Sequence, residues 1–131
     1  MAEFILDTHA CLFALAAPKK LGRRARAALR RVDAGRDQAW IPAAVATEIA
    51  LLRELGRTDI GLPQLRSALE NAPNWHFLPL DLDQVDEFSA LAAIRDPFDR
   101  LIVAAARRRG AKLVSRDERL NETGLVEIVW T

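Results

Sequence analysis

The sequence predicts an α/β protein in which helices cover a parallel sheet. Short apolar runs typical of buried strands alternate with segments of helical periodicity. The chain has 131 residues, of which 50% are apolar and 28% charged, so a packed core is expected and disorder is not. That length fits a single domain, which we expect to span residues 1–131. Strands that alternate with helices pair in parallel because each crossover connection returns the chain to the same edge.

The first half of the chain is expected to hold two strands and four helices. The clearest helix has Leu21, Ala25, Leu29 and Val32 on one face and ends near Gly35. The strands are predicted at 4–6 and 38–41. The helices are predicted at 10–16, closed by a proline, and at 21–32, 42–56 and 62–69.

The second half is expected to add three strands and two longer helices. A strand at 75–78 lies between Pro73 and Pro79, and an acidic helix follows at 82–94. Asp96 and Pro97 then open an apolar helix that ends at Gly110. The last two strands are predicted at 112–115 and 126–130, with a short turn from Asp117 between them.

Several classes of protein are excluded by composition. No apolar run approaches the roughly 20 residues that cross a bilayer, and the N-terminus lacks the basic start of a signal peptide. The single cysteine, Cys11, cannot form an intramolecular disulfide or a cysteine-based zinc site. We therefore expect a cytoplasmic protein with no membrane partner.

The net charge of +1 conceals an uneven distribution. Bases dominate residues 19–36 and 107–119, whereas acids dominate residues 70–99. Arginine is the favoured phosphate ligand, so Arg23 and Arg26 in the first basic segment are candidate RNA contacts. The alternative is a solvated helix face. The arginines at 107–109 end a helix, where cations complement its dipole.

Three carboxylates should meet at one edge of the sheet. Asp7 ends the first strand, Asp117 follows the fourth, and Asp99 lies in the first turn of the helix opened by Pro97. Ligands of such sheets bind outside the carboxyl ends of the strands. Each acid also has a structural alternative, since Asp7, Asp96 and Asp117 are all placed to cap helices.

Glu48 is the fourth candidate because it lies among apolar residues. Its helical neighbours are Val45, Leu51, Leu52 and Leu55, with Ala44 beside them, which should bury it. A buried carboxylate must be neutralised, paired or bound to metal. An ion pair with Arg100 is the structural alternative.

Asp7, Glu48, Asp99 and Asp117 together form an oxygen-only set of ligands. Closely packed carboxylates repel one another unless a cation lies among them. Such ligands suit Mg²⁺ or Mn²⁺ better than zinc or copper. A site of this kind activates water for phosphodiester cleavage.

The chain resembles the PIN-domain ribonucleases, and specifically the VapC-type toxins of prokaryotic toxin–antitoxin pairs. The matching motifs, in the family's order, are Phe4–His9, Thr47–Ile49, Asp96–Ala106 and Lys112–Glu118, and Asp-Pro-Phe-Asp-Arg at 96–100 is the most specific. The resemblance implies a three-layer α/β/α domain with a mainly parallel sheet of about five strands. It also implies an endoribonuclease dependent on Mg²⁺ or Mn²⁺, whose products carry a 5′-phosphate and a 3′-hydroxyl.

In that resemblance Asp7 and Asp99 hold the metal most directly, and Glu48 and Asp117 support them. Asp96, Thr8 and Ser115 have secondary roles, although many relatives have Thr where Ser115 stands. The implied partners are an RNA substrate, a second copy of the chain and a cognate antitoxin, which together form a hetero-oligomer.

Two alternatives belong to other functional classes. A PIN-like module that binds RNA or a partner without cleaving it would use the same fold. A receiver-like signalling domain would need paired acids after the first strand and an acceptor aspartate after the third. Here Asp7 stands alone, and the third strand ends at Leu78 and Pro79, so this second alternative fits poorly.

Overall fold

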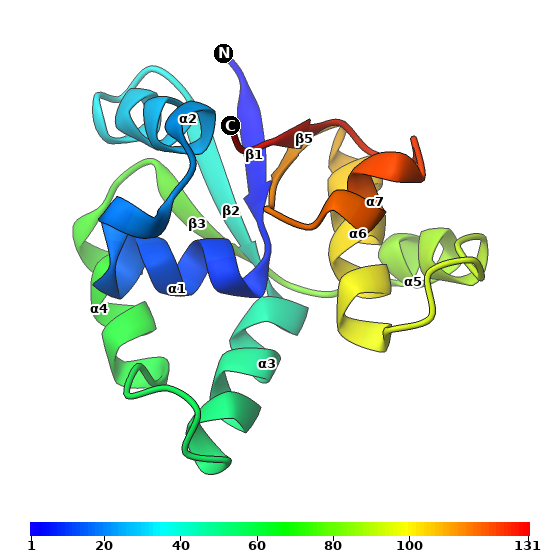
Figure 1. Cartoon of the computed structure of the whole chain (residues 1–131), viewed down its shortest axis with the longest axis horizontal. Helices are drawn as coiled ribbons and strands as arrows, with labels where there is room; N and C mark the ends of the chain where they lie inside the picture. The colour runs from blue at the N-terminus through cyan, green and yellow to red at the C-terminus, as the bar shows by residue number, and fades with distance from the viewer.

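Five parallel strands form one sheet in the computed structural model, which describes residues 1–131 (Figure 1). Their order is β3-β2-β1-β4-β5, so β1 occupies the centre. In β1, Ile5 pairs with Trp40 of β2 on one side and with Leu113 of β4 on the other. The strands are β1 (Glu3–Leu6), β2 (Gln38–Pro42), β3 (Trp75–Leu78), β4 (Lys112–Val114) and β5 (Ile128–Val129).

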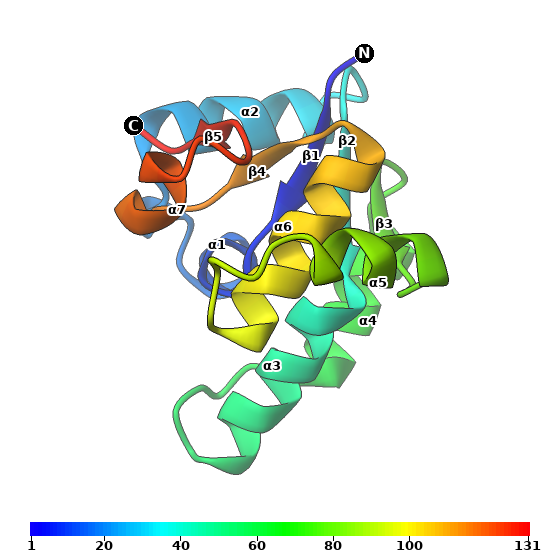
Figure 2. The ribbon, with the colours of Figure 1, turned by 90° about the vertical axis from the view of Figure 1, so that its right-hand side faces the viewer.

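Helices cover both faces of this sheet, which confirms the predicted three-layer α/β/α fold. The packing of α1 and α2 on one face and of α5 and α6 on the other can be followed in Figures 1 and 2. The helices are α1 (Thr8–Ala16), α2 (Arg23–Asp33), α3 (Ala43–Glu54), α4 (Leu62–Asn71), α5 (Leu82–Ser89), α6 (Pro97–Arg109) and α7 (Glu118–Glu122), with a short 3₁₀ turn, η1 (Pro18–Lys20).

The core lies between the sheet and its two helical layers. Ile5 and Leu113 of the central strands are fully buried, as are Val103 and Ala104 of α6. Small residues on α6 let its backbone approach the sheet closely. No helix has both the length and the apolar character that a membrane span requires.

Several predicted elements are shorter than expected, and the packing explains two of them. The helix predicted at 82–94 ends at Ser89, and two successive turns then bury Leu91 and Ile94 in the core. The strand predicted at 126–130 is reduced to Ile128–Val129. The carbonyl of Trp130 leaves the sheet ladder because it accepts a hydrogen bond (2.9 Å) from the amide of Ala25 in α2.

The strand order identifies where a ligand would bind. Chain connections run from β1 outward to β2 and β3, and then return to β4 and β5 on the other side of β1. The direction therefore reverses between β1 and β4, and ligands of open α/β sheets bind at this reversal. A receiver domain has the order 2-1-3-4-5, so the topology excludes that alternative.

Candidate active site

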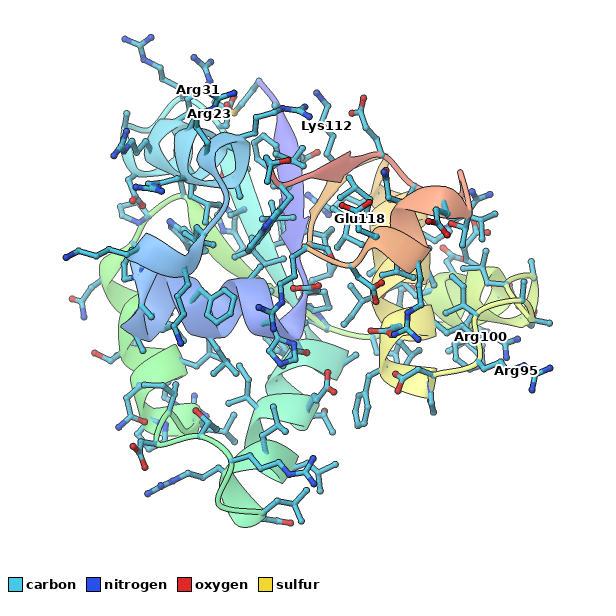
Figure 3. The ribbon with its side chains drawn as sticks, viewed as in Figure 1. Arg23, Arg31, Arg95, Arg100, Lys112 and Glu118 are labelled. Carbon is cyan, nitrogen blue, oxygen red and sulfur yellow. The ribbon has the colours of Figure 1, made fainter.

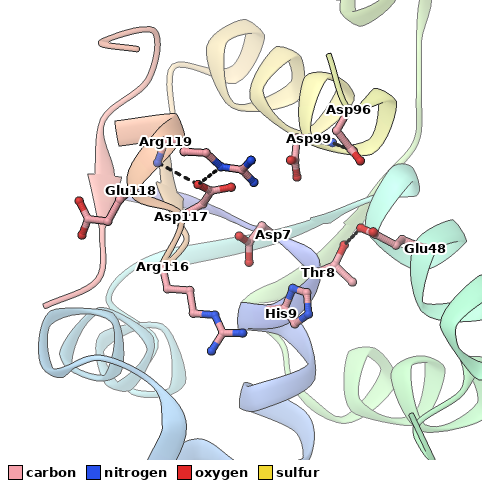
Figure 4. Close-up of a pocket in the computed structure, with 10 residues that line it drawn as sticks. All are labelled: Asp7, Thr8, His9, Glu48, Asp96, Asp99, Arg116, Asp117, Glu118 and Arg119. Carbon is pink, nitrogen blue, oxygen red and sulfur yellow. Dashed lines mark hydrogen bonds and ion pairs between the residues drawn. The ribbon is translucent and has the colours of Figure 1, made fainter. Parts of the chain in front are cut away.

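A polar cleft of about 530 Å³ opens at the carboxyl ends of β1 and β4 (Figure 4). It is lined by ten residues, none of them apolar, that come from four separate segments of the chain. The lining residues are Asp7, Thr8, His9, Glu48, Asp96, Asp99, Arg116, Asp117, Glu118 and Arg119. All four principal acids predicted from the sequence thus face one cleft.

Asp7 forms the floor of the cleft, between β1 and α1. It is the N-cap of α1, and its carboxylate accepts a hydrogen bond (2.9 Å) from the amide of Ala10. The side chain is buried, and burial raises its pKa, whereas hydrogen bonds from Ser115 and Ala10 lower it. The cap fixes the direction of this carboxylate, so the structural role and the proposed chemical role coexist.

Asp99 enters the cleft from the first turn of α6. Asp96 caps this helix by accepting a hydrogen bond (3.0 Å) from the amide of Asp99. Burial raises the pKa of Asp99 to about 6, and the negative charges of Asp96, Asp117, Glu48 and Asp7 contribute to that rise. Burial and the other acids of the cleft therefore disfavour the charged form of Asp99.

Asp117 lines the cleft at the start of α7. It caps α7 by accepting a hydrogen bond (2.9 Å) from the amide of Arg119, whose guanidinium Nε lies 3.6 Å from the same carboxylate. The amide of Asp117 donates a hydrogen bond (3.1 Å) to the hydroxyl of Ser115. Ser115 is fully buried below the cleft, so it supports Asp7 and Asp117 from behind.

Glu48 reaches the cleft from α3, where Thr8 donates a hydrogen bond (2.5 Å) to its Oε1. The expectation that an apolar face buries Glu48 is wrong. α3 projects beyond the edge of the sheet (Figure 2), which leaves Leu51 40% and Leu55 56% exposed and Glu48 half-buried.

The alternative partner of Glu48 is also wrong. Arg100 points toward α5 (Figure 3), where its Nε donates a hydrogen bond (2.8 Å) to the Phe88 carbonyl and its guanidinium stacks on the Phe88 ring.

The cleft also contains residues that sequence reasoning did not select. His9, Arg116, Glu118 and Arg119 line it, and in Figure 4 the carboxylate of Glu118 points outward. All four are within two positions of a predicted acid along the chain, Asp7 or Asp117. That proximity in sequence was the signal that could have identified them.

The candidate RNA contacts on α2 lie outside the cleft. Arg23 is exposed on that helix (Figure 3). Arg26 is half-buried, and its Nη2 is 3.4 Å from the Leu21 carbonyl. The arginines at 107–109 pair with Glu87, Asp83 and Glu3, so they stabilise the far end of α6.

The acids have the right chemistry for a hard divalent cation, although no three of them lie close enough to form a ligand set as placed. Their donors are oxygen only, which suits Mg²⁺ or Mn²⁺. Burial and, after it, the charges of four carboxylates raise the pKa of Asp99, and no lysine or arginine forms an ion pair with it, so its carboxylate lacks a counter-charge. A bound cation would supply it.

Several solved structures share this fold. A chain of the VapBC2 complex from Rickettsia felis, solved with a DNA fragment of its promoter, matches with TM-score 0.72 and 14% identity over 98% of this chain and 99% of that one. A chain of DNA-bound VapBC from Salmonella typhimurium matches with TM-score 0.68 and 18% identity over 98% and 97%. A chain of FitAcB from Neisseria gonorrhoeae gives TM-score 0.66 and 18% identity over 95% of each chain.

No curated protein matches the sequence. The PIN domain family, in contrast, matches residues 4–125, a range that runs from within β1 to beyond α7 and contains every acid of the cleft. The chain therefore belongs to the PIN domain family.

Proposed function

We propose that this PIN domain is an endoribonuclease dependent on Mg²⁺ or Mn²⁺ and acts as the toxin of a toxin–antitoxin pair. The observation that carries the proposal is the convergence of Asp7, Glu48, Asp99 and Asp117 on one cleft with no apolar lining. These acids come from four separate elements, so helix capping alone does not explain why they meet. The raised pKa of Asp99 reflects its burial and their mutual repulsion.

Asp7 and Asp99 are the residues that would hold the metal, with Glu48 and Asp117 in support. When bound, such a cation supplies a water of lowered pKa and neutralises charge on a phosphoryl oxygen. The Ala10 amide orients Asp7, the Thr8 hydroxyl orients Glu48, and the Arg119 amide orients Asp117. Hydrolysis at phosphorus would leave a 5′-phosphate and a 3′-hydroxyl.

We further propose a cognate antitoxin as the partner, in a hetero-oligomer that contains two copies of the toxin. The support is the fold: matched chains belong to VapBC complexes from Rickettsia felis and Salmonella typhimurium, and another match is described as a toxin–antitoxin complex from Klebsiella pneumoniae. Such a toxin would act in the cytoplasm, where its RNA substrates are found.

A non-catalytic PIN module that binds RNA is the second candidate. The spacing of the acids favours it, since no three of them form a metal ligand set as placed. The two candidates differ in whether a phosphodiester bond is broken, so a cleavage assay separates them.

The test is incubation of purified protein with total bacterial RNA in Mn²⁺ or in EDTA, followed by end mapping. We expect discrete new 5′-phosphate ends with the wild type in Mn²⁺, and none in EDTA or with Asp7→Asn. RNA binding by both proteins without new ends would support the non-catalytic candidate and contradict the nuclease.

A further inference from the structure

An aromatic strip extends from one wall of the acidic cleft. It consists of His9, Phe13 and Trp130: the His9 and Phe13 rings are 6.3 Å apart between centroids, and the Phe13 and Trp130 rings are also 6.3 Å apart. His9 lines the cleft itself. Because His9 and Phe13 are four residues apart on α1, they lie on one face of that helix and lead away from the acids.

Two cations flank the middle of the strip. The Arg116 guanidinium lies 5.1 Å from the centroid of the Phe13 ring, and Lys20 Nζ lies 5.7 Å from it. Both basic residues are exposed, and neither forms an ion pair within the chain. Arg116 also lines the cleft, so a positive charge lies where the acidic cleft meets the strip. The charges of Arg116 and Lys20 therefore remain available for an anionic ligand.

The strip is held in place by the backbone around it. Gly22 packs against Trp130 so closely that a Cβ there would lie 2.3 Å from the Trp130 carbonyl oxygen and 2.9 Å from its indole ring. The same carbonyl accepts the hydrogen bond from Ala25. Phe13 and Trp130 are half-buried and His9 is exposed, so all three rings remain partly accessible to a ligand.

We propose that the strip is a nucleotide-binding subsite that holds unpaired bases of the RNA next to the phosphodiester in the cleft. The inference rests on the proposed function and adds the path of the substrate to it. Aromatic faces stack on any base, and flanking cations contact the intervening phosphates. Duplex RNA keeps its bases inside the helix, so a stacking surface of this kind selects single strands.

This subsite explains the position of Arg116 better than a catalytic role does. A cation beside acids that await a divalent metal would compete with the metal, but Arg116 lies over Phe13 and not on a carboxylate. There it can contact the phosphate adjacent to the one cleaved. Arg116 is therefore a substrate-positioning residue, and its loss should raise KM more than it lowers kcat.

Fluorescence anisotropy with a labelled, unstructured RNA of about ten nucleotides tests the subsite, in EDTA so that no cleavage occurs. Phe13→Leu keeps an apolar side chain against the core, and Arg116→Gln changes only an exposed residue. We expect each to weaken binding by roughly tenfold, the loss typical of one stacked base or one strong phosphate contact. The matched controls are Phe77→Leu, at the exposed position of β3, and Arg57→Gln beyond the far end of α3, which should bind RNA as the wild type does.

The outcomes separate this inference from the proposed function. Wild-type protein that neither binds nor cleaves RNA would overturn both. Cleavage by the wild type with unchanged RNA affinity in Phe13→Leu and Arg116→Gln would overturn the subsite alone. If Phe13→Leu and Arg116→Gln keep wild-type RNA affinity but bind a co-expressed antitoxin more weakly, the strip binds a protein partner, and the RNA subsite is refuted.

Discussion

Replacing Asp99 by asparagine should stabilise the metal-free protein at neutral and alkaline pH. The Asp99 carboxylate accepts no hydrogen bond in the structure; the bond to Asp96 is donated by the backbone amide of Asp99. Burial raises the pKa of Asp99 to about 6, and the nearby charges of Asp96, Asp117, Glu48 and Asp7 contribute to that rise. The Asp99→Asn side chain would fill the same space without a charge, so repulsion is removed and no hydrogen bond is lost.

The size of the effect follows from the pKa. The native carboxyl holds its proton up to about pH 6, whereas the reference value is 3.8, so the native state binds more protons than the unfolded state between these values. Stability of the wild type therefore falls as pH rises through this window and is restored as pH falls below it. The full difference corresponds to about 3 kcal/mol, and solvent screening at a partly exposed carboxyl reduces it to roughly 1–2 kcal/mol.

This prediction is tested by measuring the Tm of the wild type and of Asp99→Asn by thermal unfolding in EDTA. For a domain of this size, roughly 4 °C accompanies each kcal/mol, so Asp99→Asn should raise Tm by about 4–8 °C near pH 8 and by almost nothing near pH 4. The control is Glu54→Gln, an exposed carboxylate on α3 outside the cleft, which should leave Tm unchanged at both pH values. A lower Tm for Asp99→Asn near pH 8, or a gain of equal size near pH 4, would refute the charge repulsion.

Further substitutions test other parts of the account. Saturating Mn²⁺ should raise the Tm of the wild type by an amount equivalent to about 2–3 kcal/mol at a hundredfold excess over Kd, and Asp7→Asn should abolish the rise; an equal rise in Asp7→Asn would place the ion elsewhere. Thr8→Val keeps the shape of the side chain but removes the hydrogen bond to Glu48, so we expect about 1 kcal/mol lower stability and roughly tenfold slower RNA cleavage. Wild-type turnover in Thr8→Val would show that Glu48 does not need this hydrogen bond. Gly22→Ala should cost about 1–3 kcal/mol in chemical denaturation because its Cβ meets the Trp130 carbonyl, and unchanged stability would contradict that close packing.

Local sequence signals predicted most of the fold. Apolar runs at 4–6 and 38–41 became central strands, and the Asp96–Pro97 and Gly110 signals delimit α6 within one residue. These signals are short-range, since capping and turn formation involve residues only a few positions apart. The end of α5 at Ser89 depends instead on where Leu91 and Ile94 enter the core, which the local sequence does not specify.

The acids of the site were also predictable, but the environment of Glu48 was not. Parallel topology places the ends of β1 and β4 together, and Asp7 and Asp117 follow those ends. The apolar face around Glu48 indicated burial, yet α3 leaves the sheet, and exposed Leu51 and Leu55 share its face. Periodicity reports which residues lie on one side of a helix and not what that side contacts.

The aromatic strip could not be found from sequence either. Phe13 lies on α1, Arg116 follows β4 and Trp130 follows β5, so the strip depends on three distant segments. Each residue alone is consistent with ordinary packing. Only the tertiary fold brings their rings and charges into contact.

The most direct test of the central claim is made in cells. Wild-type protein and Asp7→Asn are each induced, and RNA ends bearing a 5′-phosphate are sequenced, so that no substrate has to be chosen in advance. An acid-dependent nuclease predicts discrete new ends with the wild type and none with Asp7→Asn at equal levels of folded protein. Growth arrest without new ends, or the same new ends with both proteins, would contradict cleavage by the acids of this cleft.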